Sequence, residues 1–401
     1  MANSLLTIDM ITRESLRVAH EKLSFIGTVD RQYDDSFAKT GAKVGSSLRV
    51  RKPNQYTRRQ GSRVMDVQDQ NEQSGTITVA TQDGVDMKFN STELSLEIDD
   101  FSKRYIEPAV SVLASGIESD FLAYATKATY NTVGTAGTAL TTIEVPGKAR
   151  ARLNQALAPK DGNRFVQMDS VTMASIVNGT AAYFNPSGEI SKQYREGFIA
   201  RTGMADFYEN ERVWTLPNSS DITGLTLDTY TVTEGDTDLT ITGASAAPAE
   251  GMVFTIAGVY DVHPETKATL PHLKQFVVTA SSTTTDLNLS PAIYSSASGA
   301  LQNVSALPTT TAALVWVGAA STSYVQPIMY HKEAFQFITA DLPLMDDAHK
   351  CVRRNQDGLS MRVWQGSDIR NDELLMRIDI LYGMAALRPE WACRMIGAAN
   401  A

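Results

Sequence analysis

The chain contains no arginine between Arg212 and Arg353, a stretch that includes the runs Val253-Phe254-Thr255-Ile256, Gln275-Phe276-Val277-Val278 and Leu314-Val315-Trp316-Val317. Short apolar runs of this kind, separated by turn residues, are typical of a small β-barrel or β-sandwich. Two more runs fit the pattern, Thr229-Tyr230-Thr231-Val232 and Leu239-Thr240-Ile241. Because ordinary globular sequence resumes afterwards, we predict that residues 220–322 form a β-barrel domain inserted into another domain.

The charge of this stretch also separates it from the rest of the chain. Residues 222–322 hold two basic residues, Lys267 and Lys274, against eight acidic ones, which gives −6 of the net charge of −9 carried by all 401 residues. An acidic balance argues against a dedicated nucleic-acid-binding protein, although it leaves room for a local basic patch. The sequence has no run of about 18 apolar residues, so we expect no membrane-spanning helix and no membrane partner.

A projecting β-hairpin is predicted near the N-terminus, after a short helix at residues 12–27 with Thr12 as its N-cap. Residues 47–51 and 76–80 both alternate with the period of two that strands show. A long polar link joins them, and a hairpin that projects alone cannot bury its own faces. We therefore expect this hairpin to find partners on another subunit.

The strongest helical signal lies at residues 99–130. Apolar residues recur there with the helical period, at Ile106, Val110, Leu113, Ile117, Phe121, Tyr124 and Ala128. Pro108 is expected either to open this helix or to kink it.

The remaining pattern is α/β in character, since strands and helices alternate along the chain. In the last strand we expect Arg377 and Asp379 on the face opposite to Met376 and Ile378. The predicted elements are a helix at 146–157, a strand at 164–168, a helix capped by Asp169 or Ser170 that ends at 178–179, and strands at 213–216, 334–339 and 376–382.

Motifs for catalysis and for cofactor or metal binding are lacking. The sequence has no His-Glu-x-x-His or Gly-x-Ser-x-Gly pattern, and Gly134-Thr135-Ala136-Gly137 lacks the Lys-Ser/Thr ending of a phosphate loop. His263 and His272 are better explained as solvated loop residues than as metal ligands. The acid pairs Asp99-Asp100 and Asp346-Asp347 are typical of helix caps or solvated faces. We predict no enzyme activity, no catalytic residue, no cofactor and no metal site.

The most unusual feature outside the insert is a basic tract in the predicted hairpin. Its members are Arg49, Arg51, Lys52, Arg58, Arg59 and Arg63. Three interpretations compete: a solvated loop, an arm that forms salt bridges with an acidic neighbour, and a contact with nucleic-acid phosphates. Tyr56 is the tract's only aromatic residue, too few for a base-stacking platform. We favour the salt-bridging arm.

The order of these parts resembles that of the major capsid proteins of tailed bacteriophages, which have the HK-97 fold. Three stretches resemble the P-22-like coat proteins more narrowly: Ala182-Tyr183-Phe184-Asn185-Pro186, the segment from Gly197 to Asp206, and residues 381–390. The resemblance implies an α+β fold with an inserted small β-barrel. Its parts would be an N-terminal arm (1–45), an E-loop with flanking strands (46–95), a spine helix (96–135), the first part of an axial domain (136–219), the insert (220–322) and returning strands (323–401).

The same resemblance implies a function and partners. Copies would assemble as hexamers and pentamers, with a scaffolding protein and a portal protein, into an icosahedral shell that encloses double-stranded DNA and contacts it non-specifically. Assembly would occur in the host bacterial cytoplasm. The E-loop would lie over a neighbouring subunit, with Asp99, Asp100, Asp346 or Asp347 as acidic partners of the basic tract. An encapsulin-type compartment and an enzyme with a β appendage are the alternatives.

Overall fold

The computed structural model describes residues 8–34, 47–58, 61, 65, 73–90, 102–180, 205–220, 222–228, 231–344, 350–356, 358–368 and 373–398. The chain folds into two compact units, and each is described by itself. The first unit comprises Met1–Val50, Ser74–Phe121 and Phe335–Leu387. The second unit comprises Arg51–Gln73, Leu122–Ala334 and Arg388–Ala401.

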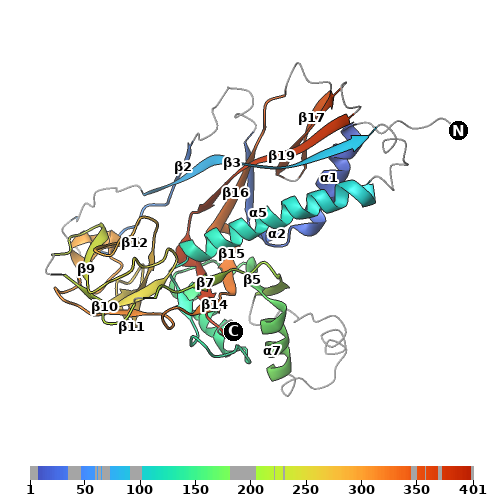
Figure 1. Ribbon diagram of the computed structural model, residues 1–401. Coiled ribbons are helices and arrows are strands. Elements are labelled where there is room, and N and C mark those ends of the chain that lie inside the picture. The colour runs from blue at the N-terminus through green and yellow to red at the C-terminus, as the bar shows by residue number, and fades with distance from the viewer. Residues whose placement is uncertain are drawn as a thin grey trace. The chain divides into compact units, whose positions relative to one another are not determined.

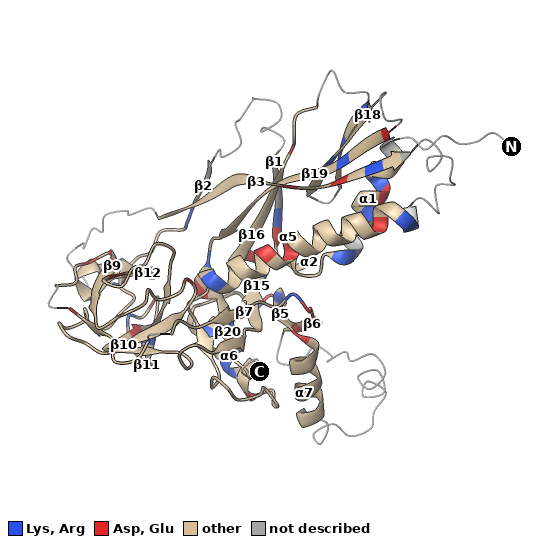
Figure 2. Ribbon diagram, in the orientation of Figure 1, with Lys and Arg blue, Asp and Glu red and all other residues tan. Residues whose placement is uncertain are grey.

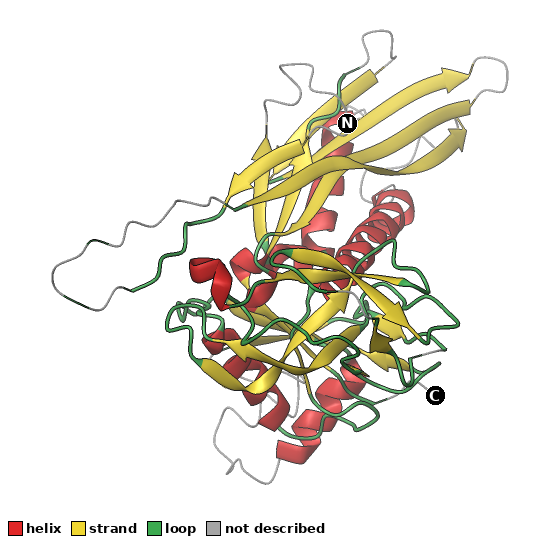
Figure 3. Ribbon diagram, turned by 90° about the vertical axis from the view of Figure 1, so that its left-hand side faces the viewer, coloured by secondary structure: helices red, strands yellow, loops and turns green. Residues whose placement is uncertain are grey.

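The first unit is built on a seven-stranded sheet that centres on the long strand β19 (Glu373–Ala386; Figures 1 and 3). Strand β3 runs antiparallel along one edge of β19, and the other edge pairs first with β18 and then with β16. The remaining strands of this sheet are β1 (Asp30–Asp34), β2 (Ser47–Arg51), β3 (Ser74–Asn90), β16 (Phe335–Ala340), β17 (Lys350–Gln356) and β18 (Leu359–Asp368).

The sequence placed strands at residues 47–51, 76–80 and 376–382, and the structure has a strand at each position. Strand β2 matches its predicted bounds, whereas β3 and β19 are longer than predicted. Their length comes from mutual pairing, which extends from Asn90 opposite Glu373 to Val79 opposite Gly383. A partner strand satisfies backbone hydrogen bonds even where the sequence lacks clear alternation. The local sequence pattern does not reveal such pairing, so it underestimates the length of these strands.

Helices cover this sheet through aromatic packing. Phe121 of α5 (Glu107–Ala128) lies with its ring centroid 4.9 Å from that of Phe25 and 5.6 Å from that of Phe337. Helix α5 follows a π-helical turn at Ser102–Ile106, so Pro108 opens the helix rather than kinking it.

Two details of the helical predictions are wrong. The N-terminal helix is α1 (Ile8–Lys22), followed by a short α2 (Phe25–Thr28), so Thr12 lies inside a helix and does not cap it. In α5 the buried stripe continues through Leu122 and Ala125, while Tyr124 is 37% exposed. The stripe drifts because 3.6 residues per turn do not repeat evenly over a long helix.

The second unit contains a five-stranded mixed sheet flanked by helices. Its strand order is β4-β20-β15-β5-β6, and β5 matches the predicted strand. Asp169 caps α7, because its Oδ2 accepts a hydrogen bond from the Thr172 backbone N–H at 3.0 Å. The elements are β4 (Thr132–Val133), α6 (Glu144–Gln155), β5 (Arg164–Met168), α7 (Ser170–Thr180), β6 (Asp206–Glu209), β15 (Ile328–His331) and β20 (Ala392–Met395).

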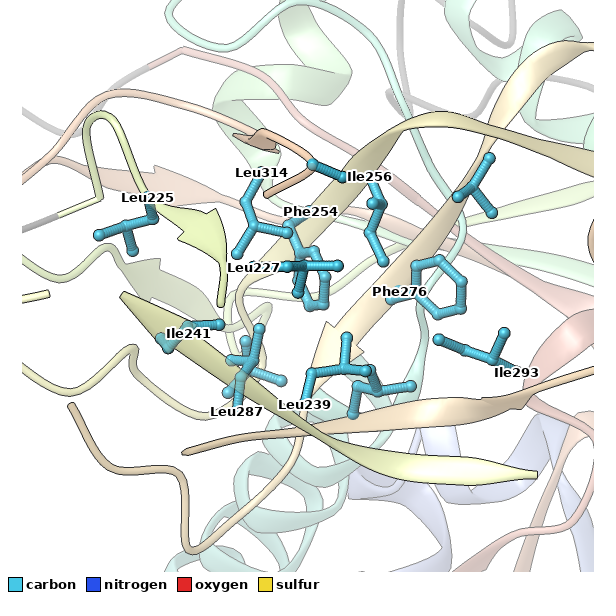
Figure 4. Packing of buried hydrophobic residues seen from close by; sticks show 14 of the residues in the cluster. Leu225, Leu227, Leu239, Ile241, Phe254, Ile256, Phe276, Leu287, Ile293 and Leu314 are labelled. Carbon is cyan, nitrogen blue, oxygen red and sulfur yellow. The ribbon is translucent and has the colours of Figure 1, made fainter. Parts of the chain in front are cut away.

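The arginine-free stretch forms a six-stranded antiparallel sheet with the order β13-β10-β11-β12-β9-β8. Leu227, Leu239, Phe254 and Phe276 point toward one another inside it, and all are at most 2% exposed (Figure 4). The strands are β8 (Thr226–Leu227), β9 (Asp236–Thr242), β10 (Val253–Val262), β11 (Thr269–Val278), β12 (Asp286–Ile293) and β13 (Leu314–Trp316).

The chain enters and leaves this sheet at one place. Strand β7 (Thr215–Pro217) pairs antiparallel with β14 (Ser323–Val325), with Leu216 opposite Tyr324. Apart from Leu216 and the half-buried Trp214, the hydrophobic cluster of the sheet draws its residues from positions 222–320. Paired ends and a separate core are the geometry that allows a segment to be inserted in a host domain.

One predicted strand of the insert is wrong in part. Thr231 and Val232 have no strand conformation, and Thr229 and Tyr230 lie outside the described residues. Val232 is nevertheless buried in the cluster, at 4% exposed. Its alternation with threonine therefore reflects burial of a loop side chain rather than strand pairing.

Candidate assembly surface and its supports

The candidate assembly surface begins at strand β2, which pairs with β3 and carries the first residues of the basic tract. Val50 of β2 packs against a buried apolar cluster of the first unit that includes Ile77, Ile338 and Leu381. One face of β2 is thereby held against the sheet. The alternation of strand residues directs the neighbouring side chains of β2, Arg49 and Arg51, to the other face.

The described arginines of this tract are exposed. Arg49, Arg51 and Arg58 are exposed, and Lys52 is half-buried (Figure 2 marks Lys and Arg in blue). The Arg49 Nε donates a hydrogen bond to Ser74 Oγ at 2.8 Å, a neutral partner that leaves the charge uncompensated. Within the described residues, Arg58 makes no hydrogen bond and no ion pair.

The other predicted contact residues lie outside the described residues. These are Arg59 and Arg63 in the tract, together with the acids Asp99, Asp100, Asp346 and Asp347. The structure therefore brings Arg49, Arg51 and Lys52 together on and directly after β2, and it tests none of the predicted pairs of arginine and aspartate.

A buried ionic network braces the sheet of the first unit. Asp379 of β19 is fully buried, and its two carboxylate oxygens each accept a hydrogen bond at 2.6 Å, one from Arg362 and one from Arg377. Arg377 and Asp379 lie on one face of β19, as predicted, and their side chains contact each other. Asp379 is nevertheless enclosed by its neighbours. Gly84 on β3 makes this possible, because a Cβ there would lie 2.5 Å from Asp379 Oδ1.

A second carboxylate fixes the segment that leads toward the predicted acids Asp346 and Asp347. Asp341 Oδ1 accepts a hydrogen bond from Ser360 at 2.6 Å, and its Oδ2 lies 3.1 Å from Arg353. Arg353 and Arg362 also donate to the backbone carbonyls of residues 342 and 343. Charge-assisted hydrogen bonds of this kind hold a backbone segment more strongly than neutral ones.

The N-terminal segment is fastened by one buried glutamate on α5. Glu118 is 0% exposed, and its Oε1 accepts hydrogen bonds from the Ser24 N–H, the Ser24 hydroxyl and the Phe25 N–H. These are the donors at the start of α2, which has no other side-chain cap. Sequence analysis missed this role, although an acid inside the apolar stripe of a helix is a recognisable signal.

The insert is attached to the mixed sheet of the second unit by buried polar groups. Arg394 of β20 is 0% exposed and donates at 2.8 Å to the carbonyls of both Thr129 and Gly251. Burial lowers the pKa of Arg394 to about 9. Sequence analysis also missed Arg394, although one arginine within the apolar run 391–396 marks a buried polar contact.

Two surface contacts support the same attachment. Lys127 lies 3.0 Å from Glu250, and its ammonium group is 5.3 Å from the ring centroid of Trp214. Exposed pairs of this kind contribute less than about 1 kcal/mol each. Arg394 therefore carries more of the attachment than Lys127.

Inside the insert, Asp261 contacts two basic side chains. Asp261 accepts a hydrogen bond from Lys274 at 2.9 Å and lies 3.2 Å from His272. Burial raises the pKa of Asp261, but the bonds to His272 and Lys274 outweigh that effect and lower it to about 2. The prediction that His272 is a solvated loop residue is wrong, because His272 lies within β11 and contacts this carboxylate. His263 lies in a loop, and its Nδ1 accepts from the backbone N–H groups of residues 265 and 266.

The described part of the chain contains no cluster of three or more His, Cys, Asp or Glu side chains that would hold a metal ion. A search of the same residues finds no helix long and apolar enough to cross a membrane.

Comparison with known proteins identifies the family. The family model described as "P22 coat protein - gene protein 5" matches residues 42–397, which is most of the chain. No curated protein matches the chain.

Several solved structures of phage proteins also match the chain. The capsid of Ralstonia phage GP4 matches with a TM-score of 0.49 at 9% identity, covering 95% of this chain and 92% of that chain. Mycobacterium phage Che8 gives a TM-score of 0.47 at 10% identity, covering 93% and 90%. The CUS-3 coat protein I-domain is 30% identical, with a TM-score of 0.20, and covers 24% of this chain and 96% of its own.

The family match spans the hairpin, the long helix, the mixed sheet and the insert, and it begins after α1, α2 and β1. The predicted α+β fold is confirmed. The chain belongs to the P22 coat protein family and is a coat protein, a structural component of a phage shell.

Proposed function

We propose that this coat protein assembles as hexamers and pentamers into an icosahedral shell, and that the basic tract on β2 and after it grips an acidic surface of a neighbouring copy. The observation that carries the contact is the exposure of Arg49, Arg51 and Arg58 in a chain whose net charge is −9. A second copy also carries a net charge of −9, so complementary charges favour an acidic surface as the partner of the tract.

The finer steps of assembly are also proposals. A scaffolding protein would guide the lattice, a portal protein would occupy one vertex, and packaged double-stranded DNA would touch the inner surface without sequence preference. Assembly would take place in the cytoplasm of the bacterial host, and the protein would have no catalytic role. The division into six parts, with the insert at 220–322, is proposed on the paired ends of β7 and β14.

The arm contact is tested by reversing charges. Arg58→Glu combined with Arg59→Glu should impair shell assembly, measured by sucrose-gradient sedimentation and electron microscopy. An exposed ion pair contributes up to about 1 kcal/mol, which raises the assembly threshold about fivefold when it is lost from every subunit. Lys160→Glu is the matched control, because Lys160 is equally exposed but lies outside the tract.

A second pair of substitutions identifies the partner. Adding Asp99→Arg and Asp100→Arg to the double variant should restore assembly if these acids face the tract, and Asp346→Arg with Asp347→Arg tests the other pair. Normal assembly of the Arg58/Arg59 variant would remove the arm proposal. If shells form normally but retain less DNA, the tract contacts nucleic-acid phosphates instead.

A further inference from the structure

The second unit contains an open cavity of about 630 Å³ between the segment 132–142 and helix α6. Helix α6 contributes Glu144, Lys148 and Arg152, which are spaced four residues apart and therefore share one face. The opposite wall is rich in hydroxyl groups: Thr132, Thr135, Thr138, Thr141 and Thr142. The lining thus combines two cations with many hydrogen-bond donors.

Arg152 has no dedicated partner in the described part of the chain. Its side chain is half-buried, and it makes no hydrogen bond and no ion pair there. The neighbouring groups do not neutralise it. Burial raises the pKa of the Cys393 thiol to about 12, so that thiol is uncharged at neutral pH, and Asp261 is already paired with Lys274. A guanidinium in this position offers its fork of donors to the cavity.

Thr132 fixes one wall of the cavity. The residue is 5% exposed, and its Oγ1 is buried, so a ligand in the cavity does not reach that hydroxyl. The Thr132 backbone is held by Gln275 of the insert, which accepts from the Thr132 N–H at 2.8 Å and donates to the Thr132 carbonyl at 2.9 Å.

The glycine loop itself is not the binding element. The Gly137 N–H donates to Gly397 and the Thr138 N–H donates to Thr135, so these amides are used within the protein. The absence of a phosphate-loop motif therefore fits the structure. Lys148 is more available, because its 2.7 Å pair with Glu144 joins two exposed side chains and is readily exchanged for a stronger anion.

We propose that this cavity binds a phosphate-type oxyanion. Arg152 would bind two of its oxygens, while the Lys148 ammonium binds another. The guanidinium fork of Arg152 and the ammonium group of Lys148 can make charge-assisted hydrogen bonds to the oxygens of a phosphate. Inorganic phosphate and a nucleic-acid backbone offer this same chemistry.

The test uses the full-length, unassembled chain in phosphate-free buffer at constant ionic strength, with inorganic phosphate as the probe and calorimetric titration as the measurement. We expect the unaltered chain to bind phosphate. Arg152→Gln should weaken binding roughly tenfold or more, the effect of losing a charge-assisted hydrogen bond. Arg150→Gln removes the same charge from the same helix outside the cavity, so its affinity should stay within about twofold.

One further variant and a competitor complete the design. If Arg152→Gln does not fold, Arg152→Lys keeps the charge and loses the fork, and weaker binding is again expected. Competition by a short DNA duplex would assign the site to nucleic-acid phosphate, and lack of competition would assign it to free phosphate. No phosphate binding, or equal affinity in the unaltered chain and the Arg152 variants, would overturn the proposal.

Discussion

Replacing Asp261 by asparagine should destabilise the chain in a manner that depends on pH. The pKa of Asp261 is lowered from 3.8 to about 2 by His272 and Lys274. A shift of this size corresponds to about 2.4 kcal/mol of stability. The loss in the variant can exceed this figure, because Lys274 is 7% exposed and would lose its carboxylate partner.

The sign of the pH dependence follows from the lowered pKa. The contribution of Asp261 is complete above its unfolded-state pKa near 4 and disappears as the pH falls through about 2, because the folded state then takes up the proton as well. The stability difference between the unaltered chain and Asp261→Asn should therefore be largest near pH 6 and should shrink between about pH 4 and 2.

Urea unfolding of the unassembled full-length chain, followed by circular dichroism at several pH values, measures this difference. Glu265→Gln is the matched control, because Glu265 is an exposed acid of the same insert and its loss should change stability by less than about 0.5 kcal/mol. A difference between Asp261→Asn and the unaltered chain that stays constant from pH 6 to pH 2.5 would refute the ionic account of this cluster.

Three other predictions concern how the parts are held. Residues 222–322 produced alone should give a folded β domain by circular dichroism and amide chemical-shift dispersion; an unfolded fragment would contradict the separate core. Arg394→Met leaves two buried carbonyls without donors and should lower the free energy of unfolding by about 2–4 kcal/mol, measured by urea unfolding; an unchanged midpoint would show that Arg394 does not hold the insert. Glu118→Ala should cost about 1–3 kcal/mol and speed proteolysis near Ser24, whereas unchanged cleavage there would contradict its fastening role.

Much of the fold could be predicted because local patterns and tertiary structure agree. Strand β5 lies at its predicted bounds, and the insert strands β9, β10, β11 and β13 each contain a run recognised in the sequence. Their apolar residues form the cluster of the inserted sheet. Where local propensity and global packing coincide, short-range reading of the sequence succeeds.

The missed features depend on partners that are distant in the sequence. Asp379 is enclosed only because Gly84 allows the strands to approach, and Glu118 finds its donors 93 and 94 residues away. Arg394 reaches Gly251 across 143 positions. The alternation of residues along one strand, or the apolar stripe along one helix, carries no information about such long-range contacts. A single charged residue within an apolar run does show where to look for them.

The assembly contacts stay predictions for a related reason. A basic tract and four candidate acids can be read from the sequence, but which pairs meet is decided between copies of the chain. Arg49, Arg51 and Arg58 are exposed, as a contact with another copy requires. Charge-swap variants are needed to identify the acidic residues that pair with them.

Cryo-electron microscopy of particles formed by the full-length chain tests the central claim most directly. We predict closed icosahedral shells in which each subunit shows residues 226–316 as a separate β domain, joined to the subunit at β7 and β14, with the β2–β3 hairpin lying over an adjacent copy. Particles that remain small oligomers, or a map in which those residues merge with their flanks into one continuous core, would contradict it.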